Sequence, residues 1–569
     1  MFKRLKVLVA MSLLLVGCSK VPLLNNDSFM FSSEPKYGKL DKESLEREIN
    51  RQQGIEQNSV NSQKVNSENL PFEEKILEEK ATTENSKQDE IVQEDVVEDV
   101  DDNGNVEEEA IEETVEDKPV VQKPVEKPKQ SKVEETKLNL KDNLKNSNIS
   151  YYAVDLKTGK VLANYRGENV AIPASVMKIM TSATALEVLG EDTRLETKVL
   201  YDGKINKGVL NGDIYIQGGG DPTLGSDGFK GNREAFIDTW VNAVKKAGIK
   251  SINGEIIVID NLFGYDGVPG KWLLEDLASG YGQAVYGISV FDNTTNVFLS
   301  SNSDSTKVEK IKPSVKNLTF ENHLKISPKG KNDIYVRGVP FENRRFLVGE
   351  MAKNIKMTSI KTDIPDPGMF LGEYFKEKLE QSGIDVKGKV KTARTTPKRA
   401  KNAKVLIVTK SKTIGEIVKV LLTRSDNHYT EHLYQLIKLK NVDINEYWAK
   451  KGINTKALEM YDGSGLSRSN NLTAKTLVDI LVYMYKNHPQ YINLLPRAGY
   501  EGTVVGFLPK SRFNGVAKVK SGSMGGVQSY AGYAEQGNKK IAFAILINHW
   551  TGSRRSVKNE MEKMVKNLF

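Results

Sequence analysis

The sequence predicts a mixed α/β (α+β) fold in which helices cover both faces of one antiparallel sheet. Strand-forming residues and a helical run open the folded part at 149–189, and about three strands and a helix close it at 517–568. Because each end needs an apolar partner, the two ends are expected to share that sheet. Between them, short apolar runs alternate with turns over 195–410, which predicts nested, strand-rich inserted domains.

Residues 1–18 have the pattern of a cleaved secretory signal. A basic start is followed by an apolar run that is too short to span a membrane comfortably. The run ends in Leu-Val-Gly-Cys18, which resembles the lipobox of bacterial lipoproteins and implies cleavage before Cys18 with lipid attached to its thiol. The alternative is an ordinary signal with a stray cysteine, but Cys18 is the only cysteine. We expect a bacterial cell-envelope protein, secreted and held by lipid on a membrane, on the periplasmic or outer-surface side.

Residues 19–137 are expected to form a disordered tether, acidic at first and then rich in Pro and Lys. The segment 71–120 contains 20 Asp and Glu against 4 Lys and Arg, a net charge of −16, and such a block repels itself. The Pro-spaced run at 118–132 favours an extended chain. Since the whole protein carries +8, the remainder carries +24. That charge favours an anionic surface such as a cell wall, or it is simply solvated; no nucleic-acid partner is expected.

The first helix after an opening hairpin carries a candidate nucleophile. Residues 149–165 place strand-forming side chains around a Lys-Thr-Gly-Lys turn, which predicts the hairpin. Pro173 is tolerated near a helix start, and the helical run that begins at Ser175 stops at Gly190. Ser175 and Lys178 are three apart and share a helix face, where the amine can take the proton of the hydroxyl. The Ser-x-x-Lys pattern alone also occurs by chance. The alternative is an ordinary helix in which the serine is only a cap.

Two further patterns have weak functional interpretations. The glycines of 218–222 suggest a phosphate cradle, but neither Gly-Lys-Ser/Thr nor G-x-G-x-x-G accompanies them, which favours a tight turn. His428 and His432 are four apart and can share a helix face, yet Glu431 is the only obvious additional ligand. A pair of polar helix residues is therefore favoured, and neither a metal nor a cofactor is expected.

Two more polar clusters lie in the C-terminal part. Ser-Asp-Asn at 425–427 falls at a break between helical segments of 412–440, where these residue types are also favoured as helix caps. Lys-Ser-Gly-Ser at 520–523 falls in the first of the closing strands. In the order Ser-x-x-Lys, Ser-x-Asn and Lys-Ser-Gly, the clusters match the signatures of the penicillin-binding proteins and serine β-lactamases, with Ser in place of the commoner Thr in the third.

The spacing of the clusters resembles one branch of these enzymes. Ser175 and Ser425 are 250 positions apart, and Ser425 and Lys520 are 95 apart, whereas a class A β-lactamase places its first two motifs far closer. Over about 140–569 the chain is similar to the class C low-molecular-mass penicillin-binding proteins, the D-alanyl-D-alanine carboxypeptidase/endopeptidase family (peptidase family S13). Further stretches that carry the resemblance are Gly-Gly-Gly-Asp-Pro-Thr-Leu at 218–224, Asp-Gly-Ser-Gly-Leu-Ser-Arg at 462–468, Gly-Tyr-Glu-Gly-Thr at 499–503 and Lys-Ser-Gly-Ser-Met-Gly-Gly-Val-Gln-Ser-Tyr-Ala-Gly-Tyr at 520–533.

The resemblance implies a β-lactamase/transpeptidase-like catalytic domain with two nested inserted domains. We place the catalytic domain at 138–198 and 411–569. The first inserted domain is expected at 199–217 and 311–410, and the second, inserted into the first, at 218–310. The N-terminal tether is not part of the family's usual pattern.

The resemblance also implies an acyl-enzyme mechanism on peptidoglycan stem peptides. Ser175 attacks the carbonyl between two D-alanines, with Lys178 as the base, its pKa lowered by burial beside Lys520. The backbone N–H groups of Ser175 and Ser523 hold the oxyanion. Ser425 relays a proton to the leaving amine, and water then cleaves the acyl-enzyme.

Substrate binding is implied for the third motif. Lys520, Ser521 and Ser523 bind the terminal carboxylate, with Gly522 in the same strand, and Asn427 holds the substrate amide and Lys178. β-Lactams are expected as covalent inhibitors.

Within the family, an acidic residue of the innermost domain can meet the ammonium of a diaminopimelate side chain. Asp276 is the best match here, with Met524 lining the same pocket. Two alternatives stay open. A β-lactamase is disfavoured by the spacing and by the lack of a Glu placed to activate a deacylating water. A wall-binding protein with a degenerate active site is disfavoured because every required side chain is present.

Overall fold

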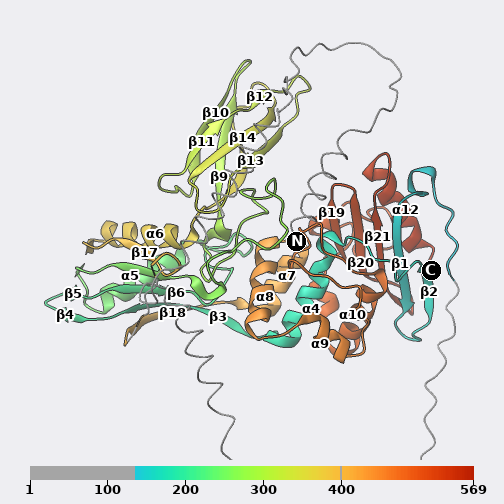
Figure 1. Ribbon diagram of the computed structural model, residues 1–569, viewed down its shortest axis with the longest axis horizontal. Helices are drawn as coiled ribbons and strands as arrows, with labels where there is room; N and C mark the ends of the chain where they lie inside the picture. Colours follow the sequence, from blue (N-terminus) through green and yellow to red (C-terminus); the bar gives the residue numbers. More distant parts are fainter. Residues whose placement is uncertain (1–134, 397–399, 401) are drawn as a thin grey trace, which may run out of the picture. The chain divides into compact units, whose positions relative to one another are not determined.

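The computed structural model describes residues 135–396, 400 and 402–569 (Figure 1). The expected signal peptide, Cys18 and nearly all of the expected tether lie outside the described residues. Within the described part of the chain, no helix is both long enough and apolar enough to cross a membrane.

A five-stranded antiparallel sheet joins the two ends of the folded part, and its strands can be followed in Figure 1. Its order is β19-β20-β21-β1-β2, and every neighbouring pair is antiparallel. The register places Ala153 opposite Phe543 and Val519 opposite Gly532. The prediction that both ends share one sheet is confirmed. The strands are β1 (Asn148–Asp155), β2 (Val161–Tyr165), β19 (Lys518–Met524), β20 (Val527–Gln536) and β21 (Lys539–Asn548).

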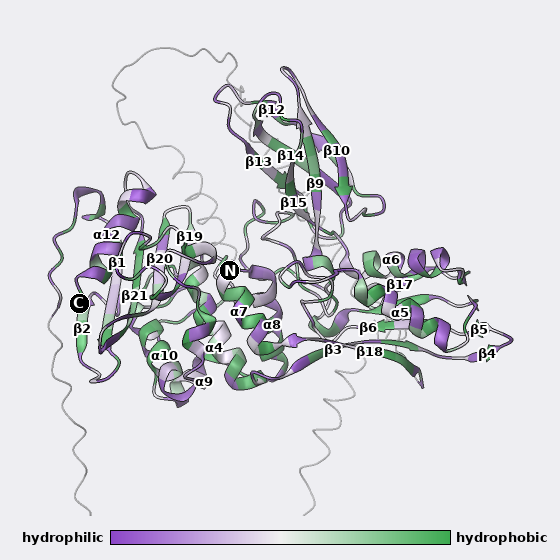
Figure 2. Ribbon diagram, turned by 180° about the vertical axis from the view of Figure 1, so that it is seen from behind, coloured by the Kyte–Doolittle hydropathy of each residue, from purple (hydrophilic) through white to green (hydrophobic). Residues whose placement is uncertain are grey.

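Helices cover both faces of this sheet because its central strands are apolar on both sides, as the colouring of β21 shows (Figure 2). On one face, Val154 and Leu546 share a buried cluster with residues of α4, α7, α8 and α10. On the other face, Ile545 and Ile547 pack with Met561 of α12. The helices are α4 (Met177–Leu189), α7 (Ile414–Arg424), α8 (Asn427–Leu439), α9 (Ile444–Lys450), α10 (Ala474–Asn487), α11 (Tyr491–Leu494) and α12 (Arg554–Lys566).

The inserted region contains a second five-stranded sheet, in the order β17-β8-β6-β3-β18. Two helices, α5 (Ala235–Lys246) and α6 (Pro367–Gln381), pack on it around Trp240 and Phe375, whose rings meet edge to face at 5.6 Å. Its strands are β3 (Arg194–Tyr201), β6 (Ile214–Gln217), β8 (Ile256–Ile259), β17 (Val390–Thr392) and β18 (Lys404–Thr413). A small adjoining sheet, β16-β7-β5-β4, is formed by β4 (Lys204–Asn206), β5 (Val209–Asn211), β7 (Ser251–Ile252) and β16 (Asp385–Val386).

Two further sheets have a core of their own around Val297, Leu299 and Leu347. The first has the order β10-β9-β15, and in the second β11, β12 and β13 all pair with β14. The strands are β9 (Thr294–Ser301), β10 (Thr306–Lys312), β11 (Thr319–Asn322), β12 (Lys325–Ile326), β13 (Asp333–Arg337), β14 (Arg344–Met351) and β15 (Thr358–Asp363).

These pairings divide the inserted region at other residues than those expected. The expected boundary between 218–310 and 311–410 cuts through β10, and β15 pairs with β9. Because β8 pairs in parallel with β6, and α5 packs on the same sheet, residues 235–259 belong with 194–217. The two strands of a parallel pair are usually connected through a helix. The sequence pattern of each strand does not show which other strand it pairs with. We therefore propose the innermost domain at about 264–363.

Candidate active site

Ser175 lies in a short 3-10 turn, Ala174–Val176, directly before α4 begins. β19 comes close to this turn at Gly522. A Cβ on that glycine would lie 3.0 Å from the backbone nitrogen of Ser175, inside normal contact distance. Glycine therefore lets the strand that carries Lys520 approach the serine turn, and the first and third motifs meet.

Lys178 is the buried centre of the site. Its Nζ donates to Ser175 Oγ at 3.0 Å, to Asn427 Oδ1 at 2.6 Å and to the carbonyl oxygen of Ser464 at 2.6 Å. These acceptors match the three protons of an ammonium group. Burial lowers the pKa of Lys178 to about 8. Three nearby carboxylates act in the opposite direction on this pKa: Asp462, Glu431 and Asp426.

The second motif lies at the junction of α7 and α8, where the sequence predicted a helix break. Ser425 ends α7 in the left-handed conformation, with φ of 59°, and the Asp426 side chain caps α8. This turn brings Asn427 to Lys178. The Asn427 Nδ2 donates to the carbonyl oxygen of Tyr281, in the inserted region, at 2.9 Å.

Lys520 on β19 reaches the second motif from the opposite side. Its buried Nζ donates to Ser425 Oγ at 2.7 Å and to the Ser521 carbonyl oxygen at 2.6 Å. Burial first, and then the like charge of Lys178, lower the pKa of Lys520 well below its usual value. The Ser521 hydroxyl bonds that of Thr503 at 2.7 Å. All five residues expected to be catalytic thus lie in one polar centre, in which the two lysines are buried and the other three are half-buried.

Two buried carboxylates hold the loop that supplies the Ser464 carbonyl oxygen. Glu431 on α8 accepts from the backbone N–H groups of Gly463 at 3.1 Å and Ser464 at 2.7 Å. Asp462 accepts from two further loop N–H groups, and from the indole N–H of Trp272 at 2.7 Å. Burial raises the pKa of Glu431 to about 8, Asp462 adds to the rise, and the loop N–H donors oppose it. From the sequence alone, Glu431 has only a weak interpretation as a metal ligand, although the motif at 462–468 carries the family resemblance.

A cavity of about 480 Å³ adjoins Ser175 and Ser425, the two serines expected to be catalytic, and is rimmed by hydroxyl groups and cations. Ser523, expected in the site, bonds Arg554 of α12, which also donates to the carbonyl oxygens of Met524 at 2.8 Å and Val527 at 3.1 Å. No sequence pattern singled out the cations of α12, because only the tertiary fold brings them here. The lining residues are Ser175, Ser425, Thr503, Gly506, Ser521, Ser523, Gln528, Tyr530, Arg554, Arg555 and Lys558.

Asp276 and Met524 lie outside the lining of this cavity. The Asp276 carboxylate accepts from the Tyr281 hydroxyl at 3.2 Å, and burial raises the pKa of Asp276. Met524 is half-buried at the end of β19. Arg468 connects the two regions, since its guanidinium donates to the Gly525 carbonyl oxygen at 3.0 Å and its charge acts to lower the Asp276 pKa.

His428 and His432 are buried in α8 and serve packing. Their rings lie 4.5 Å apart; His428 Nε2 bonds the Ser289 hydroxyl at 2.6 Å, and His432 Nδ1 bonds the Gly220 carbonyl oxygen at 3.0 Å. Burial lowers the pKa of His428 to about 3 and that of His432 well below its usual value. Among residues 135–396, 400 and 402–569, no group of three potential ligands is placed to hold a metal ion.

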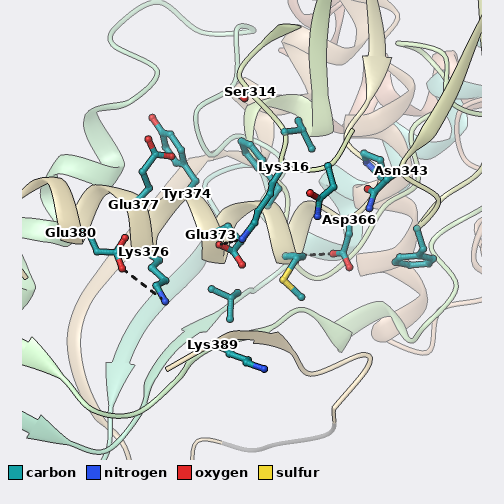
Figure 3. Close-up of a pocket in the computed structure, with 17 residues that line it drawn as sticks. Ser314, Lys316, Asn343, Asp366, Glu373, Tyr374, Lys376, Glu377, Glu380 and Lys389 are labelled. Carbon is teal, nitrogen blue, oxygen red and sulfur yellow. Dashed lines mark hydrogen bonds and ion pairs between the residues drawn. The ribbon is translucent and has the colours of Figure 1, made fainter. Parts of the chain in front are cut away.

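A larger cavity of about 920 Å³ borders α6 and is lined by none of the three motifs (Figure 3). Two of its lysines face carboxylates, with Lys316 paired to Glu373 at 3.4 Å and Lys376 to Glu380 at 3.9 Å. A serine activated by a buried base is the chemistry that the smaller cavity offers, and we place the reaction there.

Comparisons with known proteins identify the family of the chain and match its fold. A family model described as the D-Ala-D-Ala carboxypeptidase 3 (S13) family matches residues 130–568. The chain is 25% identical over 451 residues to the D-alanyl-D-alanine carboxypeptidase DacB of Haemophilus influenzae, which covers 74% of this chain and 90% of that protein. It is 28% identical over 425 residues to a D-alanyl-D-alanine carboxypeptidase of Actinomadura sp. strain R39, covering 70% of this chain and 77% of that protein. The fold is similar to the crystal structure of penicillin binding protein 4 from Haemophilus influenzae, with a TM-score of 0.66, 23% identity and coverage of 75% and 97%.

Proposed function

The chain belongs to the D-Ala-D-Ala carboxypeptidase 3 (S13) family, and we propose that it hydrolyses peptidoglycan stem peptides through an acyl-enzyme on Ser175. The proposed activity is that of a serine-type D-Ala-D-Ala carboxypeptidase, a DD-endopeptidase or both. One observation carries the proposal. A buried lysine, Lys178, lies 3.0 Å from Ser175 Oγ, and a second, Lys520, lies 2.7 Å from Ser425 Oγ.

In the first step, Lys178 in its neutral form takes the Ser175 proton as Oγ attacks the carbonyl carbon of the penultimate D-alanine. A base works best when its pKa lies near the working pH, and burial has brought the pKa of Lys178 to about 8. The backbone N–H groups of Ser175 and Ser523 are assigned to the oxyanion. Asn427, bonded to Lys178 at 2.6 Å, keeps the amine in place.

In the second step, the C–N bond breaks and the leaving amine takes a proton from the Ser425 hydroxyl, which is replenished through Lys178. Lys520 orients Ser425 and gives the leaving side of the site a positive charge. The hydroxyl groups of Ser521 and Ser523 bind the leaving residue's carboxylate. Water, activated in turn by Lys178, then cleaves the ester and restores Ser175.

Two finer assignments accompany this proposal. Asp276, held by Tyr281 and near the charge of Arg468, is assigned to the ammonium of a diamino acid side chain, with Met524 as an apolar neighbour. If Asp276→Ala leaves the discrimination between diaminopimelate and lysine substrates unchanged, the first assignment fails.

Lipid attachment at Cys18 is assigned as the membrane anchor, supported by the lipobox-like sequence before the sole cysteine. Metabolic labelling with a fatty-acid probe checks it. The wild-type chain should be labelled and Cys18→Ser should not, and equal labelling of both would contradict the anchor.

A β-lactamase remains the second candidate within the same chemistry. No acidic side chain lines the catalytic cavity, so none there is placed to activate a deacylating water, which favours a long-lived penicillin adduct.

The deciding experiment is intact-mass analysis of the purified protein after incubation with benzylpenicillin, beside Ser175→Ala. We expect a stable adduct of one penicillin in the wild type and none in the variant. Rapid penicillin loss without an adduct would indicate a β-lactamase, and an adduct that persists in Ser175→Ala would remove Ser175 as the nucleophile.

A further inference from the structure

We propose that Arg555 and Lys558 form an anion subsite for the leaving half of the substrate, which favours cross-linked peptides with an acidic leaving strand over a single terminal D-alanine. This inference rests on the proposed function and narrows its substrate class. Both residues lie near the start of α12 and line the cavity that contains Ser175 and Ser425.

The charged side chains that line this cavity are all positive. Three of its lining residues, Arg554, Arg555 and Lys558, are cations, and none is an acid. The N-terminus of α12, capped by Ser553, adds the positive end of a 13-residue helix. Lys520 stands behind the cavity wall. An anionic ligand is therefore the chemistry that the cavity accommodates.

The three cations differ in what they already bind. Arg554 is occupied, since its guanidinium holds Ser523 and the turn between β19 and β20. Within the described residues, Arg555 and Lys558 form no ion pair with any acid. Farther along α12 the lysines are paired, Lys563 with Glu560 at 3.1 Å and Lys566 with Glu562 at 3.6 Å.

Lys558 lies at the wall of the cavity. A Cβ on Gly506, another lining residue, would lie 3.3 Å from its Nζ, so the ammonium rests against the loop that follows Thr503. The 920 Å³ cavity beside α6 differs, because acids line it beside its lysines: Asp366, Glu373, Glu377 and Glu380 (Figure 3). A lining that contains cations and no acid therefore distinguishes the cavity beside Ser175 from the one beside α6.

A pentapeptide and a cross-linked peptide differ in the leaving group that is released when Ser175 is acylated. In both, the amide C–N bond breaks, the carbonyl carbon forms an ester with Ser175 Oγ, and the leaving nitrogen gains the proton that the serine lost. A terminal D-alanine carries away one carboxylate, for which Ser521 and Ser523 are sufficient. A cross-linked substrate releases a neighbouring stem peptide, whose acidic residues place further carboxylates beyond the first. Arg555 and Lys558 are the groups available to bind them.

The test compares kcat/KM for a non-amidated cross-linked muropeptide dimer with kcat/KM for the monomeric pentapeptide. In the full-length double variant Arg555→Ala/Lys558→Ala, the ratio of dimer to pentapeptide should fall about tenfold, as expected for two partly exposed charge-assisted contacts. Raising the salt concentration should lower the wild-type ratio in the same direction. The charge-preserving swap Arg555→Lys/Lys558→Arg should recover most of the ratio.

Lys563→Ala is the matched control, because it removes a paired cation of the same helix and should leave the ratio unchanged. Benzylpenicillin acylation of each variant reports that the active site is folded. An unchanged ratio in the double variant, or an equal fall in the control, would overturn the subsite. Failure of the wild type to hydrolyse either peptide would instead contradict the proposed function.

Discussion

The contact between Glu431 and the loop that holds Lys178 gives a prediction about the pH dependence of acylation. The prediction separates an effect of Glu431 on Lys178 from an effect on the stability of the fold. Glu431 is fully buried and holds the N–H groups of Gly463 and Ser464, and the Ser464 carbonyl oxygen holds Lys178 at 2.6 Å. The perturbation is Glu431→Gln, which keeps the size of the side chain and removes its carboxylate.

The pKa of about 8 for Lys178 sets how much the acylation rate should change with pH. Only the neutral amine accepts the Ser175 proton, so the acylation rate should rise with pH through this pKa. Neutral Lys178 makes up about one tenth of the total at pH 7 and about nine tenths at pH 9, a gain of about tenfold. Glu431 raises this pKa only in its ionised form, and burial raises its own pKa to about 8, so the two groups titrate over the same pH range. Glu431→Gln removes that ionised form and should move the midpoint to lower pH.

Glu431→Gln should also lower the constant acylation rate that is reached at high pH, the plateau of the pH profile. Glutamine has one acceptor oxygen where the carboxylate had two, and its amide N–H₂ group opposes one of the loop N–H groups. Loss of a buried hydrogen bond to a charged acceptor corresponds to roughly a tenfold fall in rate. Glu431→Asp keeps the charge but not the reach, so its plateau should fall while its midpoint stays near that of the wild type.

The assay is the second-order rate constant of benzylpenicillin acylation from pH 6 to 10 at constant ionic strength, with thermal unfolding of each variant alongside. Lys178 faces Asp462, Asp426 and Lys520 as well, so these groups contribute to the curvature. A wild-type rate that is flat between pH 7 and 9 would refute Lys178 as the base. An identical midpoint in Glu431→Gln would refute the electrostatic link.

Three further predictions concern other buried contacts. Arg345→Leu removes one partner of the buried Arg345–Asp363 pair, 2.8 Å apart, and should lower the unfolding free energy by about 3–5 kcal/mol in urea titrations; a loss under about 1 kcal/mol would contradict it. Trp272→Phe removes the N–H donor to Asp462 and should slow acylation roughly tenfold, with full activity as the opposing result. Lys520→Met should lower acylation by about 100-fold or more, and a rate within a few-fold of wild type would exclude an essential role.

The three motifs are short local patterns that are weak one by one, and they could be predicted to form one site because their order and spacing resemble a known family. A Ser and a Lys three apart at a helix start have their side chains on one face, and the structure places Lys178 Nζ 3.0 Å from Ser175 Oγ. The apolar run of β21 similarly requires cover on both faces, which α10 and α12 supply. In the first case the spacing of two residues predicts their contact, and in the second an apolar run predicts that both faces of the strand are covered.

The inserted region and the supporting residues of the site could not be predicted in the same way. The parallel pairing of β8 with β6 joins strands on either side of α5, and a strand pattern does not name its partner. Glu431 reads as one more polar residue of a helix, since its acceptor role depends on a loop more than 30 positions away. The cations of α12 reach the cavity only because the last helix packs beside β20.

The inserted region completes the active site rather than merely extending the chain. Its irregular segment contributes the Tyr281 carbonyl oxygen to Asn427 at 2.9 Å and the Trp272 indole N–H to Asp462 at 2.7 Å. Asn427 is a direct partner of Lys178, and Asp462 holds the loop whose Ser464 carbonyl oxygen is another. The first contact therefore acts one hydrogen bond away from the proposed base, and the second acts through the loop that carries Ser464. Removing the insert would leave an amide and a carboxylate without these partners beside Lys178, so the two ends of the chain hold all three motifs but depend on the insert to position the base.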